Sequence, residues 1–110
     1  MERFIKGDVV VIPFPFSDLS QSKKRPALVI TSLKGEGIIL AQITSKNIYD
    51  EYAVELREKD FIEGGLKVNS NIRVNKLFTA SRDLILYKVG RINQEKIEEV
   101  INKIIEIIKL

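Results

Sequence analysis

Short runs of apolar and β-branched residues alternate with polar or glycine-containing stretches along most of the 110-residue chain. Runs of this kind, bounded by turn residues, are typical of β-strands. Pro13 and Pro15 predict the end of the first strand, because proline is confined to strand edges and ends. The polar stretch 17–24 predicts a loop. Strands are predicted over residues 8–12, 26–31, 38–44, 52–56, 71–74, 77–79 and 84–89.

Glycines mark two of the predicted turns. Gly35 and Gly37 separate the second and third predicted strands and indicate a hairpin, and Gly64 with Gly65 indicates another turn. Short strands joined by turns are typical of a small barrel or a strongly curved sheet. The length fits a single domain over residues 1–110 with one modest core, and the sequence has no repeat and no linker.

The C-terminal segment changes to a helical period. Asn93 is a favourable N-cap, and Glu95 lies in the first turn, where the helix dipole favours an acidic side chain. The segment predicts an amphipathic helix of about 16 residues. We expect its apolar face to pack against the sheet, and a partner or dimer surface is the alternative. This face consists of Ile97, Val100, Ile101, Ile104, Ile105, Ile107 and Ile108.

The composition excludes several kinds of active site. The chain contains no Cys and no His, which removes disulfides, thiol nucleophiles, the commonest general base and the commonest transition-metal ligand. No carboxylate pattern indicates a metal, so no metal or other cofactor is expected. The longest apolar run, residues 9–16, is too short to cross a bilayer, and no signal peptide is visible. We therefore expect a cytoplasmic protein without a membrane partner.

Charge is distributed unevenly, although 18 bases and 15 acids give a net charge of only +3. Residues 21–46 carry five bases and one acid, and residues 67–92 carry six bases and one acid. Folded onto one face, these segments would suit a polyanion. The alternative is that they are solvated lysines on a small domain. The six acids and two bases of residues 50–63 are interpreted as a solvated face.

Polar residues at strand ends form the candidate site. Lys24 and Arg25 lead into the second predicted strand, and Thr44 and Ser45 end the third. If these strands form a hairpin, Arg25 and Thr44 lie near the same end of the sheet. A guanidinium can donate two parallel hydrogen bonds to a phosphate in a fixed geometry, and a hydroxyl adds a further hydrogen bond.

Three more polar residues lie close together in a later predicted strand. Arg73 and Asn75 are two residues apart, so they point to one face of that strand, and Lys76 adjoins them. Together with the strand-end residues they could bind a phosphodiester and stabilise a charged transition state without a metal. Solvated side chains at strand ends are the alternative.

Five motifs, in order along nearly the whole chain, closely resemble those of MazF/PemK/Kid-type toxins. The Gly-Asp that opens the first strand, the Arg-Pro-x-Leu-Val and the Thr-Ser are the specific parts. The motifs are residues 7–10 (Gly-Asp-Val-Val), 13–16 (Pro-Phe-Pro-Phe), 24–30 (Lys-Arg-Pro-Ala-Leu-Val-Ile), 42–45 (Gln-Ile-Thr-Ser) and 70–79 (Ser-Asn-Ile-Arg-Val-Asn-Lys-Leu-Phe-Thr).

The resemblance implies a mainly β protein, a small SH3-like curved barrel with an amphipathic C-terminal helix, that usually forms a homodimer. It implies the toxin half of a type II toxin–antitoxin pair, which binds a cognate antitoxin protein. Family members are mostly metal-independent endoribonucleases that cut single-stranded RNA at short sequences. The 2′-hydroxyl attacks the adjacent phosphate and leaves a 2′,3′-cyclic phosphate and a 5′-hydroxyl.

The resemblance also assigns roles to residues. Arg25, Thr44 and Arg73 match the catalytic positions of the family. Arg25 would move a proton or hold the phosphate, and the second role is physically safer because a guanidinium keeps its proton in proteins. The Thr44 hydroxyl would bind the scissile phosphate. Lys24 and Ser45 would support it by binding RNA.

Asn75, Lys76 and Phe16 complete the predicted RNA-binding residues. Some members carry an acidic residue at the position of Asn75, and an amide cannot take a proton as a carboxylate would. Many members carry an arginine at the position of Phe78, so the sequence preference does not carry over. Phe16 flanks the polar loop that matches the family's mobile loop at the RNA groove. Its ring could stack on an unpaired base or pack at the rim of the core.

Two other functions stay open. One is a non-catalytic poison of a protein target, like the CcdB-type gyrase inhibitors, since a fold does not fix a function. The isoleucine-rich C-terminal helix fits that reading, because that family traps its target through its C-terminal end. The other is an RNA-binding module that has lost cleavage, which Asn75 would favour.

Overall fold

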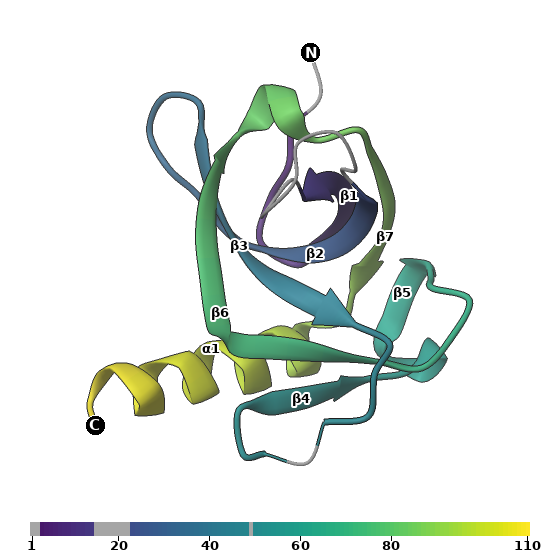
Figure 1. Ribbon diagram of the computed structural model, residues 1–110, viewed down its shortest axis with the longest axis vertical. Coiled ribbons are helices and arrows are strands. Elements are labelled where there is room, and N and C mark those ends of the chain that lie inside the picture. The colour runs from purple at the N-terminus through teal and green to yellow at the C-terminus, as the bar shows by residue number, and fades with distance from the viewer. Residues whose placement is uncertain (1–2, 15–22, 49) are drawn as a thin grey trace.

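In the computed structural model of the chain, which describes residues 3–14, 23–48 and 50–110, a curled antiparallel sheet is followed by one α-helix (Figure 1). This confirms the mainly β, SH3-like barrel with a C-terminal helix. The strands are β1 (Asp8–Phe14), β2 (Lys23–Ser32), β3 (Gly37–Thr44), β4 (Ala53–Leu56), β5 (Phe61–Gly64), β6 (Ser70–Ser81) and β7 (Tyr87–Ile92). The 3₁₀ turns are η2 (Glu58–Asp60) and η3 (Arg82–Leu84), and the helix is α1 (Gln94–Ile108).

The sheet has the strand order β4-β6-β3-β2-β1-β7-β5. β2 and β3 form the predicted hairpin, with Ala27 opposite Gln42. Alternate residues of the central strands enter two different core clusters: in β2, Leu28 enters one and Val29 the other. Both faces of β1, β2 and β3 are therefore buried, which explains why these strands are continuous apolar runs rather than alternating ones.

The C-terminal helix forms as predicted and packs against the sheet. The Asn93 side chain caps it by accepting a hydrogen bond from the Lys96 N–H at 2.8 Å. Ile97, Val100 and Ile104 are buried in the first core cluster, whereas the rest of the apolar face becomes more exposed toward the C-terminus. No helix of the described residues is long and apolar enough to span a membrane.

One long strand replaces two predicted ones. β6 has 12 residues and runs through the region expected to separate residues 71–74 from 77–79. A register shift explains the misleading pattern: Ala41 of β3 pairs with Leu77, while the next residue, Gln42, pairs with Arg73. The intervening residues of β6 have no partner in β3, and the strand turns sharply at this point (Figure 1). Asn75 and Lys76 lie at this bend, and both are exposed.

Other strands also differ from the prediction. β2 begins at Lys23 rather than at residue 26, so the last two residues of the predicted loop 17–24 belong to the strand, and residues 17–22 of that loop lie outside the described residues. β1 continues through Pro13, which lies opposite Lys24 near the strand end, where a missing N–H is tolerated. β7 begins at Tyr87 rather than at residue 84, because η3 comes first and Ser81 Oγ accepts the Asp83 N–H at 3.3 Å. β5 was not predicted as a strand at all.

An ionic cluster joins β1, β5 and β7. Asp8 is fully buried, and Arg91 Nη2 lies 2.9 Å from its Oδ1. Lys88 Nζ donates a hydrogen bond to Glu63 Oε1 at 3.0 Å, and Arg91 Nε lies 3.6 Å from the same oxygen. The Lys88 ammonium, with a smaller effect of Arg91, holds the pKa of Glu63 below its ordinary value of 4.5. Glu63 is exposed, so the contribution of this pair to stability is modest.

This lowered pKa predicts the direction of an acid effect. An acid with a depressed folded-state pKa stabilises the protein above its ordinary pKa, and that stabilisation is lost as the pH falls through the folded value. We expect Glu63→Gln to have a lower midpoint of thermal unfolding than the wild type at pH 7. The difference should shrink as the pH falls below 4.5. Glu98→Gln, on the polar face of α1, is the control, and a pH-independent difference for Glu63→Gln would contradict the prediction.

Candidate functional site

Two basic hollows lie side by side at the ends of β2 and β3. The first, called here the Arg73 hollow, has a volume of about 270 Å³. The second, the lysine hollow, has a volume of about 380 Å³. They share a wall formed by Arg25, Ile43, Thr44 and Lys46. No acidic side chain of the described residues lines either one, so the predicted basic face exists and is concave here.

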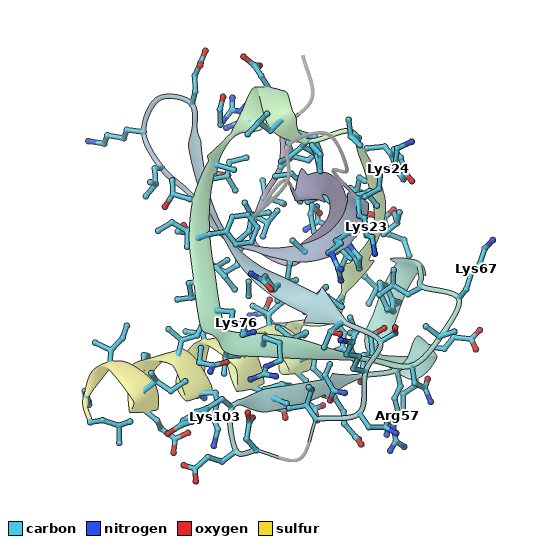
Figure 2. The ribbon with its side chains drawn as sticks, in the orientation of Figure 1. Lys23, Lys24, Arg57, Lys67, Lys76 and Lys103 are labelled. Atoms are coloured by element: carbon cyan, nitrogen blue, oxygen red, sulfur yellow. The ribbon has the colours of Figure 1, made fainter. Side chains whose placement is uncertain are left out.

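The bases of the lysine hollow come from three separate parts of the chain. They are Lys23, Lys24, Arg25, Lys46 and Lys67. In Figure 2, Lys23, Lys24 and Lys67 project from one side of the molecule, and Lys103 lies away from them on α1. Such a concentration of positive charge raises the local concentration of a polyanion.

The β2–β3 hairpin places Arg25 and Thr44 together. Ala27 lies opposite Gln42, and Arg25 and Thr44 follow two residues beyond that pair on their strands. The Thr44 hydroxyl accepts the Lys46 N–H at 3.2 Å, which leaves its own proton free to donate. Asn71 of β6 donates to the Lys46 carbonyl at 3.0 Å and so ties the turn after β3 to the neighbouring strand.

Arg73 enters its hollow from β6, the strand next to the edge strand β4. It lies on β6 opposite Gln42 of β3 and Ala53 of β4, and its side chain is only 11% exposed. Nη2 donates to Asp50 Oδ2 at 2.9 Å and to Asn75 Oδ1 at 3.4 Å. The second contact confirms that Arg73 and Asn75 share a face.

The bend in β6 brings Lys76 into the same hollow as Arg73. Residues three apart in a regular strand point to opposite faces. The register shift between Ala41 and Gln42 breaks that alternation, so both side chains reach one cavity.

Six of the eight predicted site residues line one of the two hollows. Asn75 contacts Arg73 but does not line a hollow, and Phe16 lies outside the described residues. Phe78 packs against the second core cluster. The catalytic and RNA-binding roles of the eight predicted site residues stay predictions. Arg25, Thr44, Arg73 and Lys76 line the Arg73 hollow, and Lys24 and Ser45 line the lysine hollow with Arg25 and Thr44.

The interpretation of residues 50–63 as a solvated face is wrong for Asp60, which is 7% exposed. Asp50 is exposed as expected, but its ion pair with Arg73 was not predicted. No local signal marks Asp50, because its partner lies 23 residues away in the sequence and on another strand. Lys67 was also missed as a site residue, although it opens the second basic segment of the sequence.

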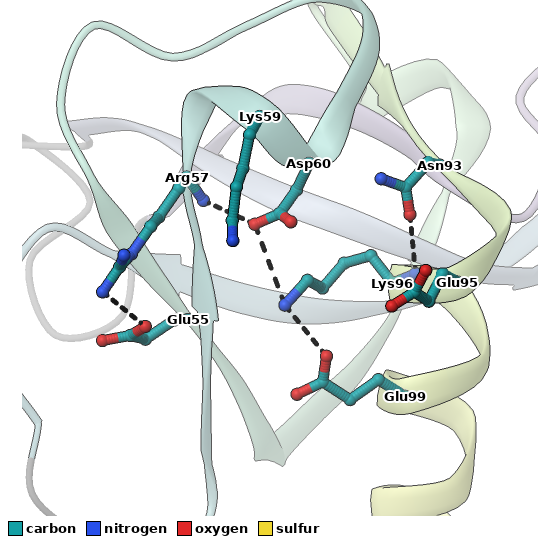
Figure 3. A pocket seen from close by; sticks show the side chains of 8 residues that line it. All are labelled: Glu55, Arg57, Lys59, Asp60, Asn93, Glu95, Lys96 and Glu99. Carbon is teal, nitrogen blue, oxygen red and sulfur yellow. Dashed lines mark hydrogen bonds and ion pairs between the residues drawn. The ribbon is translucent and has the colours of Figure 1, made fainter.

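A third hollow, of about 360 Å³ between η2 and α1, has a different character (Figure 3). It is lined by both acids and bases, several of which pair with one another: Lys96 Nζ lies 2.9 Å from Glu99 Oε1 and 3.7 Å from Asp60 Oδ2. The Asp60 carbonyl accepts the Asn93 N–H at 2.8 Å. These contacts hold the start of α1 on η2. Among the described residues, no group of three or more acids is arranged to hold a metal ion.

A family model matches residues 5–108, and its description is a PemK-like, MazF-like toxin of type II toxin–antitoxin systems. The chain belongs to this toxin family. The match spans both strands of the shared wall, the whole of β6 and the helix. The toxin's two basic hollows therefore lie inside the family domain. A search of curated protein sequences gave no match.

Solved structures share the toxin fold at low sequence identity. An endoribonuclease in complex with its cognate antitoxin, from a Mycobacterial species, has a TM-score of 0.78 at 10% identity, with 98% of this chain and 97% of that chain covered. The Mycobacterium tuberculosis toxin MazF-mt6 has a TM-score of 0.74 at 15% identity, with 94% and 97% covered. MazF from Deinococcus radiodurans has a TM-score of 0.73 at 16% identity over all of both chains.

Proposed function

We propose that this toxin is a metal-independent endoribonuclease that cleaves single-stranded RNA by attack of a 2′-hydroxyl on the adjacent phosphate. The products would be a 2′,3′-cyclic phosphate and a 5′-hydroxyl. The observation that carries the proposal is the pair of basic hollows that share a wall containing Arg25 and Thr44. No acid of the described residues lines either hollow, and Arg73, 11% exposed, lines one of them. The names of the solved relatives, which include an endoribonuclease, support the same activity.

Within this proposal, each side chain has a role that its chemistry permits. During the reaction, the 2′-oxygen gives its proton to solvent water and bonds to phosphorus. The bond to the 5′-oxygen breaks, and that oxygen takes a proton from water to become the 5′-hydroxyl. Negative charge grows on the phosphate oxygens in the transition state. Arg25 and Arg73 would neutralise that charge, because a guanidinium donates hydrogen bonds and keeps its proton. The Thr44 hydroxyl would donate one more hydrogen bond. Donors held in place before the reaction contribute most to such stabilisation.

The lysine hollow would bind phosphates next to the scissile one. An extended strand that crosses the shared wall has phosphates on both sides of it, and three lysines, Lys23, Lys24 and Lys67, line only the lysine hollow. Lysine holds phosphate as a point charge without fixing its orientation. This hollow would therefore contribute affinity, while the Arg73 hollow would contribute catalysis.

The same surface suits the inhibitor. We propose that a cognate antitoxin covers the two hollows with an acidic segment that folds as it binds. One solved relative is named as a complex with its cognate antitoxin. A homodimer in the cytoplasm is the expected working form.

The first experiment incubates the purified toxin with a long single-stranded RNA in EDTA and identifies the fragment ends. We expect discrete fragments with 2′,3′-cyclic phosphate and 5′-hydroxyl ends. Arg25→Ala and Thr44→Ala should each reduce the cleavage rate by roughly a hundredfold to a thousandfold, because each removes a fixed donor to the developing charge. Arg57→Ala is the matched control, since Arg57 is an exposed arginine that lines neither basic hollow.

The outcomes separate the candidate functions. Undiminished cleavage by an Arg25→Ala, Thr44→Ala double variant would contradict the site assignment. RNA that is bound but never cut by the wild type would indicate a binding module. RNA neither bound nor cut, with growth arrest and DNA damage, would indicate a poison of a protein target such as gyrase.

Salt dependence tests the lysine hollow separately. Lys24→Gln and Lys67→Gln should each weaken binding of a 2′-O-methyl RNA, which cannot be cleaved by this route. Each should also lower the slope of log Kd against log salt by roughly one, as expected for one lost phosphate contact. Lys103→Gln is the control, because it removes the same charge from α1 (Figure 2). An equal effect of all three variants would show non-specific attraction only.

A further inference from the structure

We infer that Asp50 is a positioning residue that holds the Arg73 guanidinium in its catalytic orientation. The inference rests on the proposed ribonuclease activity. Among the described residues, bases and no acids line the two hollows. Yet Arg73, the least exposed of these bases, forms an ion pair with Asp50, a carboxylate that lines neither hollow. Arg73 is 11% exposed and Asp50 is 43% exposed.

Both oxygens of Asp50 are engaged, so the carboxylate is itself held in place. Oδ2 accepts from Arg73 Nη2 at 2.9 Å, and Oδ1 accepts the Tyr52 N–H at 2.9 Å. The Tyr52 carbonyl in turn accepts the Val74 N–H at 3.1 Å. Three hydrogen bonds thus connect the backbone at Val74, through Tyr52 and Asp50, to the guanidinium of the adjacent Arg73.

Asp50 is the stronger of two contacts on the guanidinium. The Asn75 amide oxygen contacts the same nitrogen at 3.4 Å, which is long for a hydrogen bond. Arg73 Nε is buried and has no hydrogen-bond partner among the described residues. Without the Asp50 carboxylate, one long contact at Nη2 would have to restrain a side chain with large rotamer entropy. A charged pair also restrains it more strongly than a neutral one.

Asp50 acts through Arg73 rather than on the substrate. It does not line either hollow, and its two oxygens are already occupied. Both described contacts of the guanidinium use Nη2, so other N–H groups of the fork stay available to a phosphate. Ile48, two residues before Asp50 in the chain, lines the Arg73 hollow.

Two effects of the carboxylate oppose each other, which makes the inference testable. Its negative charge weakens the attraction of the hollow for RNA, whereas its contact orients Arg73 for the transition state. Asp50→Asn should therefore lower kcat by roughly tenfold to a hundredfold, as misplacement of a catalytic group does. KM and the Kd for the 2′-O-methyl RNA should stay unchanged or fall. General damage to the fold would instead raise both KM and this Kd.

The experiment uses an oligonucleotide that spans the cleavage site mapped with the long RNA. Asp50→Asn, Asp50→Glu and Glu55→Gln are compared with the wild type in kcat, KM and thermal midpoint. Asp50→Glu restores the charge and should recover part of kcat. Glu55→Gln is the matched control, because Glu55 pairs with Arg57 at the same 2.9 Å on neighbouring β4 but lines neither basic hollow. Asn75→Ala, which removes the weaker contact, should lower kcat less than Asp50→Asn does.

A double-mutant cycle isolates the route through Arg73. In an Arg73→Ala background, Asp50→Asn should have no further effect on single-turnover cleavage, because its target is gone. A further loss there would show that Asp50 acts on the substrate directly and would overturn the inference. So would an unchanged or raised kcat for Asp50→Asn itself. Absence of cleavage by the wild type would instead remove the proposed function and this inference with it.

Discussion

Burial of both faces of β1, β2 and β3 is the constraint on which the rest of this structure depends. A flat sheet in a chain of 110 residues could not cover two apolar faces, because one short helix protects only one of them. The sheet therefore curls: one core cluster packs under α1, and the other lies within the curl (Figure 1). The polar ends of β2 and β3 are then left at the rim, and Arg25 and Thr44 are the residues that stand there.

The bend in β6 adds two further bases, Arg73 and Lys76, to the hollow that Arg25 and Thr44 line. Arg73 lies on β6, paired with β3 on one side and β4 on the other, and the register shift that follows brings Lys76 to the same cavity. Like charges so close together repel one another, and repulsion favours side chains that swing out into solvent. The ion pair with Asp50 holds Arg73, the least exposed of these bases, against that repulsion.

The sequence predicts those parts of the molecule whose signals are local. The hairpin and the cap at Asn93 depend on near neighbours, and they formed as expected. β5 was missed because Gly64 and Gly65 were interpreted as a turn alone. Gly64 has a φ of +63°, and a Cβ there would lie 2.0 Å from the Val89 carbonyl oxygen, so the glycine permits close approach of β5 to β7. Lys76 was predicted from its place beside Arg73 and Asn75, but the bend that brings it into the Arg73 hollow was not. Asp50 reaches Arg73 across 23 residues of sequence, and no local pattern contains that contact.

The proposed site consists of arginine, lysine and threonine, and the factor that sets its catalytic rate differs from that of a site built around histidine. Histidine exchanges a proton near neutral pH, so its catalytic power depends partly on its pKa. A guanidinium keeps its charge, and its contribution depends on where its fork points when charge develops on the phosphate. Orientation is a property of the surroundings: for Arg73 it comes from the β6 register, from Asn75 and above all from Asp50. In such a toxin, residues that never touch RNA should affect the rate of cleavage as strongly as some that do.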